Sequence, residues 1–526
     1  MSVAPPSGPF SGRTIQLVRD LSIDEQYYLY ETTRRLKQAV VSGDDTSAFR
    51  INDDAVGVYL LFFEDSTRTK ESFRNAAKFH RTKVNDFDAK SSSLQKKESI
   101  SDTVRMLFGY SETSIFVVRT QQEGVCRWLE EALGNYAERA GLAAPGIING
   151  GDGRHEHPTQ EFLDEFSFLE HMNWDRSHVH VALVGDLFHG RTVHSKVDGL
   201  KVFGEVRVDL VAPEDIGMPS HYKERMRESG FAVREFASID EYLAAGDHAS
   251  IWYFTRLQLE RMGERLLDRA PALRHDVTFR RDHLEHLHEG TEFFHPLPRH
   301  QETPTIPYFL DTLPVNGWDR QSMNGYFTRI VQIGMLGGRL GTDFAGASPV
   351  EPTINKDFVV AAPIEPKPKP DYKIGIKPVE TGIVIDHIGK GRAASKIWDH
   401  IDKIRRTLGL DRIGSHGVFA SGDTELLKGI ISLPGVGEFD RRKLKMLAAI
   451  APGCTLNTVK DHQVVEKFRM HMPPRVYNLE EISCKNEDCI SHPRHHEGVS
   501  PDFYRSAETT FICRYCERPH RYREIW

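Results

Sequence analysis

The chain has little of what would place it among secreted, membrane or nucleic-acid-binding proteins. Its 526 residues include only six cysteines, too few for a disulfide framework, and no stretch approaches the ~18 apolar residues that a membrane-spanning helix requires. The N-terminus is not a charged start followed by an apolar core, and the formal net charge of -7 leaves no excess of positive charge. We therefore expect a cytoplasmic protein with no nucleic-acid partner and no membrane partner.

The order of the apolar segments indicates the fold class. Between about positions 50 and 310, short apolar runs alternate with amphipathic stretches, as in VGVYLLFF, SIFVVR, HVHVALVGD, VRVDLVAP, ASIWYFTR and GTEFFHPLP. Buried strands that alternate with helices are typical of parallel sheets covered by helices, so we predict an α/β fold. Ligands of such sheets bind beyond the carboxyl ends of the strands.

One segment lacks the glycines of the common nucleotide-binding loops and can still hold a phosphate. The run Ser66-Thr67-Arg68-Thr69 follows a predicted strand at 56–64 and begins a predicted helix. At a helix start the free backbone N–H groups and the positive end of the dipole attract an anion, and here hydroxyls and a guanidinium add further donors. The alternative is an ordinary Ser/Thr helix cap beside a surface arginine.

Further polar residues follow other predicted strands. Arg119 comes directly after SIFVV, and GGDGRHEHPTQ brings His157 and Gln160 to the start of an amphipathic helix. Each has an ordinary alternative, since strand-end arginines are common on surfaces and His157 can be a hydrogen-bonded structural histidine. The polar, cationic segment SSSLQKKES at 91–99 can likewise be a solvated loop.

A second strand-loop-helix unit suggests a second anionic substrate. VALVGDLFHGRTVHS places Arg191 at another helix entrance, and Arg256 and Gln258 follow the strand ASIWYF. The segment FFHPLPR at 293–299 ends a strand in a proline-fixed turn. Its carbonyl groups are free to accept hydrogen bonds from an amide NH2.

In combination, these segments resemble the aspartate carbamoyltransferase family. The resemblance rests on FFEDSTRTKESF, SSLQKKES, the arginine after SIFVV followed by QEG, GDGRHEHPTQ, VGDLFHGRTVHS, YFTRLQLER and HPLPR, in the family's order over most of residues 50–340. It implies two parallel-sheet domains of the carbamoyltransferase fold. It also implies carbamoyl phosphate and L-aspartate as substrates and a homotrimeric catalytic unit.

The resemblance assigns a role to each candidate of the catalytic site. Carbamoyl phosphate would be bound by Ser66, Thr67, Arg68, Thr69, Arg119, His157, Gln160 and the Pro296-Leu297-Pro298 turn. The carboxylates of aspartate would be bound by Arg191, Arg256 and Gln258. Ser93 and Lys96 would reach the site of a neighbouring subunit, but Lys97 stands where the family has a glycine, so either lysine could contact the substrates. Catalysis would depend on Arg68, Thr69, Lys96, Arg119 and His157.

Proline marks the boundary after this catalytic part. A further helix is predicted at 318–340. Residues 342–371 then contain six prolines and include the run EPKPKP, which predicts a stiff, extended linker. Beyond it, YKIGIKPVETGIVIDHI and HGVFASGD read as strands around a helix near 392–407. This pattern predicts a small α+β domain.

Four of the six cysteines lie near the end of the chain. Cys484 and Cys489, then Cys513 and Cys516, have the spacing of a tetrahedral zinc site closed by four thiolates. Such a zinc would be structural, and no cofactor is expected in the chemistry. Two disulfides are an alternative that the expected cytoplasmic location disfavours, and a zinc ribbon for nucleic acid is another.

Residues 372–526 resemble the regulatory chain that is a separate polypeptide in some members of the family. The likeness is carried by TGIVIDHIGKG, the APGCTLNTV run, QVVEKF and CKNEDCISH. It implies a site for nucleotide effectors that uses Asp386, His387 and Lys467, although Asp386 and His387 could otherwise form a simple turn. A second nucleotide-contacting lysine has no clear counterpart, Lys428 being the nearest candidate.

Together these expectations divide the chain as follows: a carbamoyl phosphate-binding domain at 1–155 completed by the helix at 318–340, an aspartate-binding domain at 156–317, a linker at 342–371, a regulatory domain at 372–475 and a zinc-binding domain at 476–526. Two other functions compete with an aspartate carbamoyltransferase. One is an ornithine carbamoyltransferase-like enzyme, which Arg256-Leu257-Gln258 and HPLP disfavour. The other is a non-catalytic, nucleotide-sensing zinc scaffold.

Overall fold

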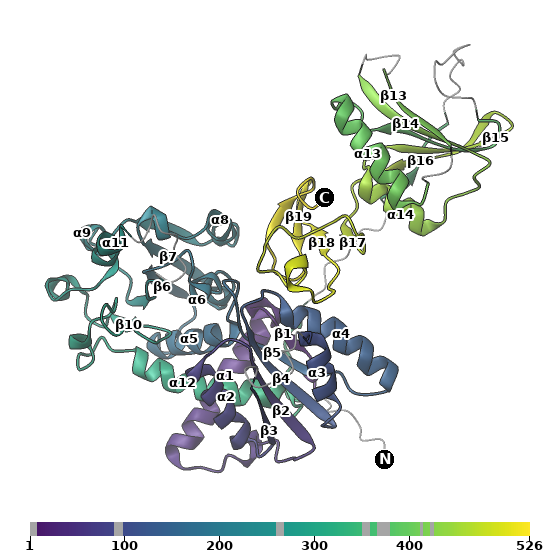
Figure 1. Cartoon of the computed structure of the whole chain (residues 1–526). Helices are drawn as coiled ribbons and strands as arrows, with labels where there is room; N and C mark the ends of the chain where they lie inside the picture. Colours follow the sequence, from purple (N-terminus) through teal and green to yellow (C-terminus); the bar gives the residue numbers. More distant parts are fainter. Residues whose placement is uncertain are drawn as a thin grey trace. The chain divides into compact units, whose positions relative to one another are not determined.

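The computed structural model describes residues 8–88, 98–258, 268–349, 358–364, 379–410, 414–420 and 426–526 (Figure 1). The chain divides into two compact units. The first consists of Met1–Val350 with Asp488–Ile490 and His495–Glu497, and the second of Glu351–Glu487, Ser491–Arg494 and Gly498–Trp526. Within the described ranges, every helix is too short or too polar to cross a bilayer.

The first sheet of the first unit is parallel and places the predicted phosphate loop beside Arg119. Its strand order is β1-β5-β4-β2-β3 (Figure 1). The central strands β2 and β4 are almost wholly buried, as continuous apolar runs require. Their register pairs Phe62 with Arg119, so β4 ends next to the loop that follows β2. The bounds are Thr14–Ile15 for β1, Val56–Phe62 for β2, Lys83–Asp88 for β3, Thr113–Thr120 for β4 and Gly146–Asp152 for β5.

The second sheet is parallel as well, which confirms the prediction of parallel-sheet α/β architecture. Its strand order is β10-β9-β6-β7-β8. A buried aromatic cluster that includes Trp252, Phe254 and Phe293 covers one face. The bounds are His178–Val184 for β6, Glu205–Val211 for β7, Ala232–Phe236 for β8, Ile251–Phe254 for β9 and Glu292–Phe294 for β10.

Two long helices connect these sheets. α5 (Pro158–His171) follows β5, and α12 (Trp318–Leu336) packs against α5 and also contacts α2, α1 and β10. α12 ends at Leu336, before the glycine pair, and not at 340 as predicted. The other helices of this unit are α1 (Ile23–Ser42), α2 (Thr67–Phe79), α3 (Ile100–Phe108), α4 (Val125–Ala140), α6 (Arg191–His194), α7 (Lys196–Gly199), α8 (Ser220–Glu228), α9 (Ile239–Ala244) and α11 (Ala270–Val277).

The second unit contains two antiparallel sheets. The larger has the order β11-β16-β15-β12-β14-β13 and is covered by α13 (Ala394–Thr407) and α14 (Arg441–Ile450), and the smaller has the order β17-β18-β19-β20. The bounds are Gly382–Ile388 for β12, Ser415–Ala420 for β13, Leu427–Pro434 for β14, Thr455–Lys460 for β15, Gln463–Met470 for β16, Arg475–Tyr477 for β17, Asp502–Arg505 for β18, Thr510–Cys513 for β19 and Pro519–Arg521 for β20. The larger sheet, with α13 and α14, forms the small α+β domain that the sequence predicts.

The proline-rich segment differs from the predicted linker in one respect. Within 342–371, Val359–Ala361 forms the edge strand β11, which pairs with Phe468–Met470 of β16. Proline is compatible with an edge position because the outer side of such a strand donates no ladder hydrogen bonds. Residues 365–378, with EPKPKP and the predicted strand YKIGIK, lie outside the described residues.

Acid should destabilise the first unit because some of its histidines are buried, and His80 provides the simplest test of this effect. Burial lowers the pKa of His80 to about 4, and its Nε2 donates to the Ile330 carbonyl at 2.7 Å. Between pH 4 and 6.5 the unfolded chain binds a proton that the folded chain does not, so stability falls as the pH falls through this window. Between pH 7 and 5 this one group should remove about 2 kcal/mol of unfolding free energy.

The measurement is chemical unfolding of wild type and His80→Gln at both pH values. The variant should show the smaller loss on acidification. The exposed His286→Gln is the matched control. If all three proteins lose the same amount between pH 7 and 5, His80 does not have this role.

Candidate functional site

A single cavity of about 790 Å³ in the first unit collects the catalytic-site candidates. It is lined from the ends of β2, β4 and β9, the starts of α2, α5 and α6, the turn after β10 and the first half of α12. Every such candidate that the structure describes lies in its wall: Ser66, Thr67, Arg68, Thr69, Arg119, His157, Gln160, Arg191, Arg256, Gln258, Pro296, Leu297 and Pro298. Ser93, Lys96 and Lys97 lie outside the described residues.

The loop after β2 is built for more than a helix cap. Ser66 occupies the N-cap position of α2, but its side chain makes no capping hydrogen bond to the helix backbone. Thr69 is buried, whereas Arg68 is exposed to the cavity. The first N–H groups of α2, the hydroxyls and the guanidinium therefore face one hollow, which is the arrangement of an anion site.

Two arginines, one at the end of β4 and one at the start of α6, meet beside this loop. Arg119 donates to the Gly150 carbonyl at 3.0 Å, and Arg191 donates to the Gly153 carbonyl at 2.9 Å. Both guanidinium groups lie 3.3 Å from the same oxygen of Glu64. This carboxylate offsets part of the repulsion between two closely placed cations.

Gly151 makes the approach of these arginines possible. Its φ of +113° lies in the region that favours glycine, and a Cβ there would lie 3.0 Å from Nη1 of Arg119 and 3.1 Å from Cζ of Arg191. A Cβ there would require both guanidinium groups to shift by a few tenths of an ångström.

His157 is held as a neutral imidazole. It is the N-cap residue of α5, is 5 % exposed, and its Nδ1 lies 3.3 Å from the Thr159 hydroxyl. Burial lowers the pKa of His157 well below 6.5, and the charges of Arg119, Arg191 and Arg329 lower it further. A neutral ring with one N–H can donate a hydrogen bond to a carbonyl oxygen without adding a further positive charge.

Gln160 is oriented from behind by a carboxylate. Its Nε2 donates to Oδ1 of Asp164 at 2.8 Å, one turn further along α5. The same Oδ1 accepts from Nε2 of Gln321 at 2.6 Å, and Oε1 of Gln321 accepts from the backbone N–H of His295 at 2.8 Å. With Nε2 engaged by Asp164, the Gln160 carbonyl oxygen is the atom left to face a ligand.

A buried ion cluster anchors Asp164 in turn. Nζ of Lys196 lies 3.0 Å from Asp164, 2.6 Å from Glu161 and 3.7 Å from Glu165, and all four side chains are inaccessible to solvent. Although burial opposes charge, the three carboxylates raise the pKa of Lys196, while burial raises the pKa of Glu165 to about 6. The cluster is therefore a rigid support behind the cavity wall.

The proline turn after β10 completes the wall. His295 is buried, and its Nδ1 accepts from the backbone N–H of Leu297 at 2.8 Å. Burial, together with the charges of Arg299, Arg256 and Arg68, lowers the pKa of His295 to about 3. The neutral ring thus fixes the turn that carries the free carbonyl groups.

The effector candidates are close together in the second unit. Lys428 on β14 contacts both oxygens of Asp386 at 2.8 and 2.9 Å, and Nδ1 of His387 lies 3.1 Å from the Thr455 hydroxyl. Burial lowers the pKa of His387, and the charges of Lys428 and Lys467 act in the same direction. Lys428, the nearest candidate for the missing second lysine, is therefore part of this group.

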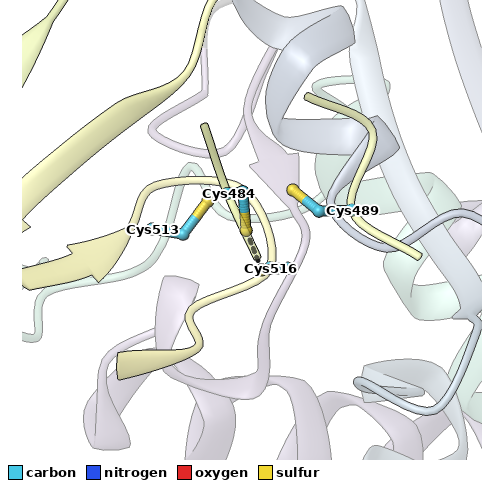
Figure 2. A group of neighbouring side chains, drawn as sticks. All are labelled: Cys484, Cys489, Cys513 and Cys516. Carbon is cyan, nitrogen blue, oxygen red and sulfur yellow. Dashed lines mark hydrogen bonds between the residues drawn. The ribbon is translucent and has the colours of Figure 1, made fainter. Parts of the chain in front are cut away.

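The four candidate metal ligands converge (Figure 2). The Sγ atoms of Cys484, Cys489, Cys513 and Cys516 all lie within 4.8 Å of one another and are buried. Sγ of Cys484 lies 3.6 Å from Sγ of Cys516, close to the ~3.8 Å that a Zn–S bond of ~2.3 Å implies for tetrahedral ligands. Nε2 of His520 lies 3.4 Å from Sγ of Cys484 and can support that ligand.

Comparison with protein families matches three parts of the chain. Residues 13–170 match the carbamoyl-P binding domain of aspartate/ornithine carbamoyltransferase, residues 374–471 the allosteric domain of the aspartate carbamoyltransferase regulatory chain, and residues 474–526 its metal binding domain. Protein PyrBI of Thermotoga maritima is 54% identical over 98% of this chain and 99% of its own length. Protein PyrBI of Treponema denticola is 51% identical over 98% of both chains.

The chain belongs to the aspartate carbamoyltransferase family. Solved structures agree with this assignment. Aspartate transcarbamoylase of Trypanosoma cruzi in complex with N-(phosphonacetyl)-L-aspartic acid has a TM-score of 0.53 and 27% identity over 62% of this chain and 97% of that chain. The catalytic subunit from M. jannaschii has a TM-score of 0.52 and 29% identity over 61% of this chain and 96% of that chain.

Within the family, this chain joins a catalytic part to a regulatory part, as the sequence predicted. The four buried thiols and the match to the metal binding domain fit a structural zinc. With four thiolate ligands, the ion would have no open position for a substrate.

Sequence reasoning missed several residues that shape the catalytic cavity: Glu64, Asp164, His295, Gln321 and Arg329. Asp164 had a usable signal, because it lies four residues after Gln160 on a predicted helix and such pairs share one face. Gln321 and Arg329 had no such signal, because they reach the cavity from α12, which lies more than 150 residues after Asp164 along the chain.

Loss of one thiolate should release the metal and destabilise the C-terminal sheet. We expect Cys516→Ser to lower the zinc content measured by elemental analysis and to make residues 476–526 sensitive to proteolysis, because zinc binding contributes directly to folding in such domains. Cys454→Ser is the matched control, since Cys454 is a buried thiol outside the cluster. A Cys516→Ser protein with unchanged zinc content and protease resistance would exclude this site.

Proposed function

We propose that this protein transfers the carbamoyl group of carbamoyl phosphate to the α-amine of L-aspartate, giving N-carbamoyl-L-aspartate and phosphate in de novo pyrimidine biosynthesis. The observation that carries the proposal is the cavity in which an anion-binding helix start, two arginines and a neutral histidine face one another. Trypanosoma cruzi aspartate transcarbamoylase, with this fold, was solved with carbamoyl phosphate and aspartate.

The phosphate of carbamoyl phosphate would bind to Ser66, Thr67, Arg68 and Thr69 at the start of α2, with Arg119 beside them. The carbamoyl oxygen would accept hydrogen bonds from Thr69, Arg119 and the N–H of neutral His157. Its NH2 group would donate to the Gln160 carbonyl oxygen and to the carbonyls of the Pro296-Leu297 turn. These contacts would orient the carbonyl carbon for attack.

Aspartate would occupy the part of the cavity lined by Arg191, Arg256 and Gln258, which suits two carboxylates. A cationic ornithine side chain would be repelled there, so aspartate is the better fit. Assaying the purified protein with aspartate and with ornithine separately decides between them. The complete set of cavity residues also argues against a non-catalytic scaffold.

In the reaction, the lone pair of the uncharged α-amine forms a C–N bond to the carbamoyl carbon, and the carbonyl electrons move to its oxygen. The resulting oxyanion is stabilised by Thr69, Arg119 and His157. It then collapses with cleavage of the C–O bond to phosphate, and the nitrogen loses a proton, for which the departing phosphate is the nearest base. Alignment of two anions can lower such a barrier by ~7–11 kcal/mol, and each oxyanion donor can add ~3–4 kcal/mol.

A homotrimer would be the active catalytic unit if Ser93 and Lys96, or Lys97, reach into a neighbouring site. A monomer in solution that retains full activity would exclude this arrangement.

Nucleotide effectors would bind at Asp386, His387, Lys428 and Lys467. A cytoplasmic location would suit the four thiolates that the zinc site requires, because reducing compartments preserve thiolates.

Removal of the central phosphate ligand should abolish efficient turnover without unfolding the protein. We expect Arg68→Ala to lower kcat/KM for carbamoyl phosphate by about 10²–10³-fold, the usual cost of one transition-state donor. Arg139→Ala, an exposed arginine on α4, is the matched control and should be silent. Near-normal rates in Arg68→Ala would remove the assignment of the phosphate site.

Asp164 should act on catalysis through Gln160. We expect Gln160→Ala and Asp164→Asn each to lower kcat/KM for carbamoyl phosphate by about tenfold, since each removes an oriented acceptor. Because Asp164 also bonds Lys196, its loss can reduce stability as well. The double variant separates the two effects: its kcat/KM should equal that of Gln160→Ala alone. If the loss of kcat/KM in the double variant equals the product of the two single losses, Asp164 does not act through the Gln160 side chain.

A further inference from the structure

A second positively charged hollow lies in the regulatory half of the chain. It has a volume of about 550 Å³ and is lined by the residues just before α13, the first three turns of α13, the end of α14 and residues 522–526. Its lining contains four cationic side chains and one carboxylate: Arg392, Lys396, Lys403 and Arg523 against Asp399. None of the effector residues Asp386, His387, Lys428 and Lys467 lines it.

Three of these cations have no carboxylate within ion-pair distance. Among the described residues, no acidic group lies within 4.0 Å of Arg392, Lys403 or Arg523, and only Lys396 is paired, at 3.6 Å, with Asp399. Arg392 instead donates to Nε2 of His400 at 2.9 Å, and the Lys403 ammonium lies 4.5 Å from the centre of the Trp526 ring. Such a cluster is repulsive unless an anion enters it.

Partial burial strengthens the repulsion. Burial lowers the pKa of Arg392, and the charge of Arg523 lowers it further. Burial also lowers the pKa of Lys403, and the charge of Arg406 adds to this shift while those of Glu481 and Asp399 oppose it. These cations are therefore partly dehydrated and close to like charge, which is the condition under which a bound anion gains most.

The walls of the hollow are firmly held. The Tyr522 hydroxyl donates to the carbonyl of Ile450 at 3.0 Å, and the Tyr522 and Trp526 rings pack edge to face with centroids 6.2 Å apart. The backbone N–H of Ser483 donates to the Ile525 carbonyl at 2.8 Å. The C-terminal wall thus faces α13 as part of the folded unit.

The start of α13 adds a further donor group. Its N-cap residue is Ala393, which lines the hollow and has no side-chain acceptor for the first N–H groups of the helix. A ligand with acceptor oxygens can accept the hydrogen bonds of these N–H groups. Arginine, lysine and an uncapped helix start form the donor set that phosphoryl oxygens match.

We propose that this hollow binds a small phosphoryl anion of two or more negative charges, such as pyrophosphate or the phosphate chain of a nucleotide. Its small size and aromatic wall do not suit a nucleic-acid duplex, and the net charge of -7 gives no broad basic surface for one. The site is separate from both the catalytic cavity and the effector residues.

Calorimetric titration of the full-length protein with pyrophosphate tests the proposal. All proteins carry Arg68→Ala and Lys467→Gln, so that neither the catalytic cavity nor the effector residues dominate the binding of the probe. In this background, Arg392→Gln with Lys403→Gln should weaken pyrophosphate binding by about tenfold or more, since two charge-assisted contacts are lost. Arg523→Gln, an exposed change, should weaken binding in the same direction.

One control gives the proposal its specificity. Lys445→Gln removes an exposed cation from α14 outside the hollow. This variant should bind pyrophosphate like the parent. Zinc content and the unfolding midpoint verify that each variant is folded, and Arg523→Gln remains informative if the double change is not tolerated.

A parallel titration with ATP identifies the source of the phosphoryl groups. Equal affinity for both probes indicates that the phosphate chain suffices, and tighter ATP binding that is lost with Arg392 and Lys403 indicates a nucleotide. If neither probe binds, or if Arg392→Gln with Lys403→Gln leaves the affinity unchanged, the hollow is not an anion site.

Discussion

Concentrated positive charge around one cavity is the constraint on which the catalytic half depends. Arg68, Arg119, Arg191 and Arg256 all line the same space, and like charges at such distances repel. Glu64 bridges two of them, and the neutral rings of His157 and His295 add no further charge. The arrangement is most favourable when anions fill the cavity, which is why two negatively charged substrates suit it.

The surrounding fold holds this charge in place. Arg119 lies in β4 and Arg191 begins α6, and each is fixed by a backbone carbonyl close to β5. The buried group of Lys196 with Glu161, Asp164 and Glu165 lies behind Gln160, so polar side chains of the cavity are oriented by a solvent-free network. Networks of this kind resist rearrangement because any broken contact leaves a buried group unsatisfied.

Much of the architecture could be predicted from local patterns. The buried strands β2, β4, β6 and β9 contain the apolar runs from which they were predicted. The predicted end of α12, residue 340, lies four residues beyond its observed end at Leu336. Strand β5 was missed, because its sequence GIINGGD is rich in glycine, which is rare in strands. Edge strands such as β1 and β11 were also missed, since two or three residues carry too little periodicity.

By itself the sequence singled out the candidate residues of the site: the order of the motifs, the hydroxyls and arginine after β2, and the spacing of the four cysteines are local properties of the chain. Only the tertiary structure decided how they act together. The register of β2 with β4, the shared contact of Arg119 and Arg191 with Glu64, and the orientation of Gln160 by Asp164 and Gln321 join segments far apart along the chain. Such contacts depend on how the sheets and α12 pack, and packing leaves no local signature in the amino-acid order.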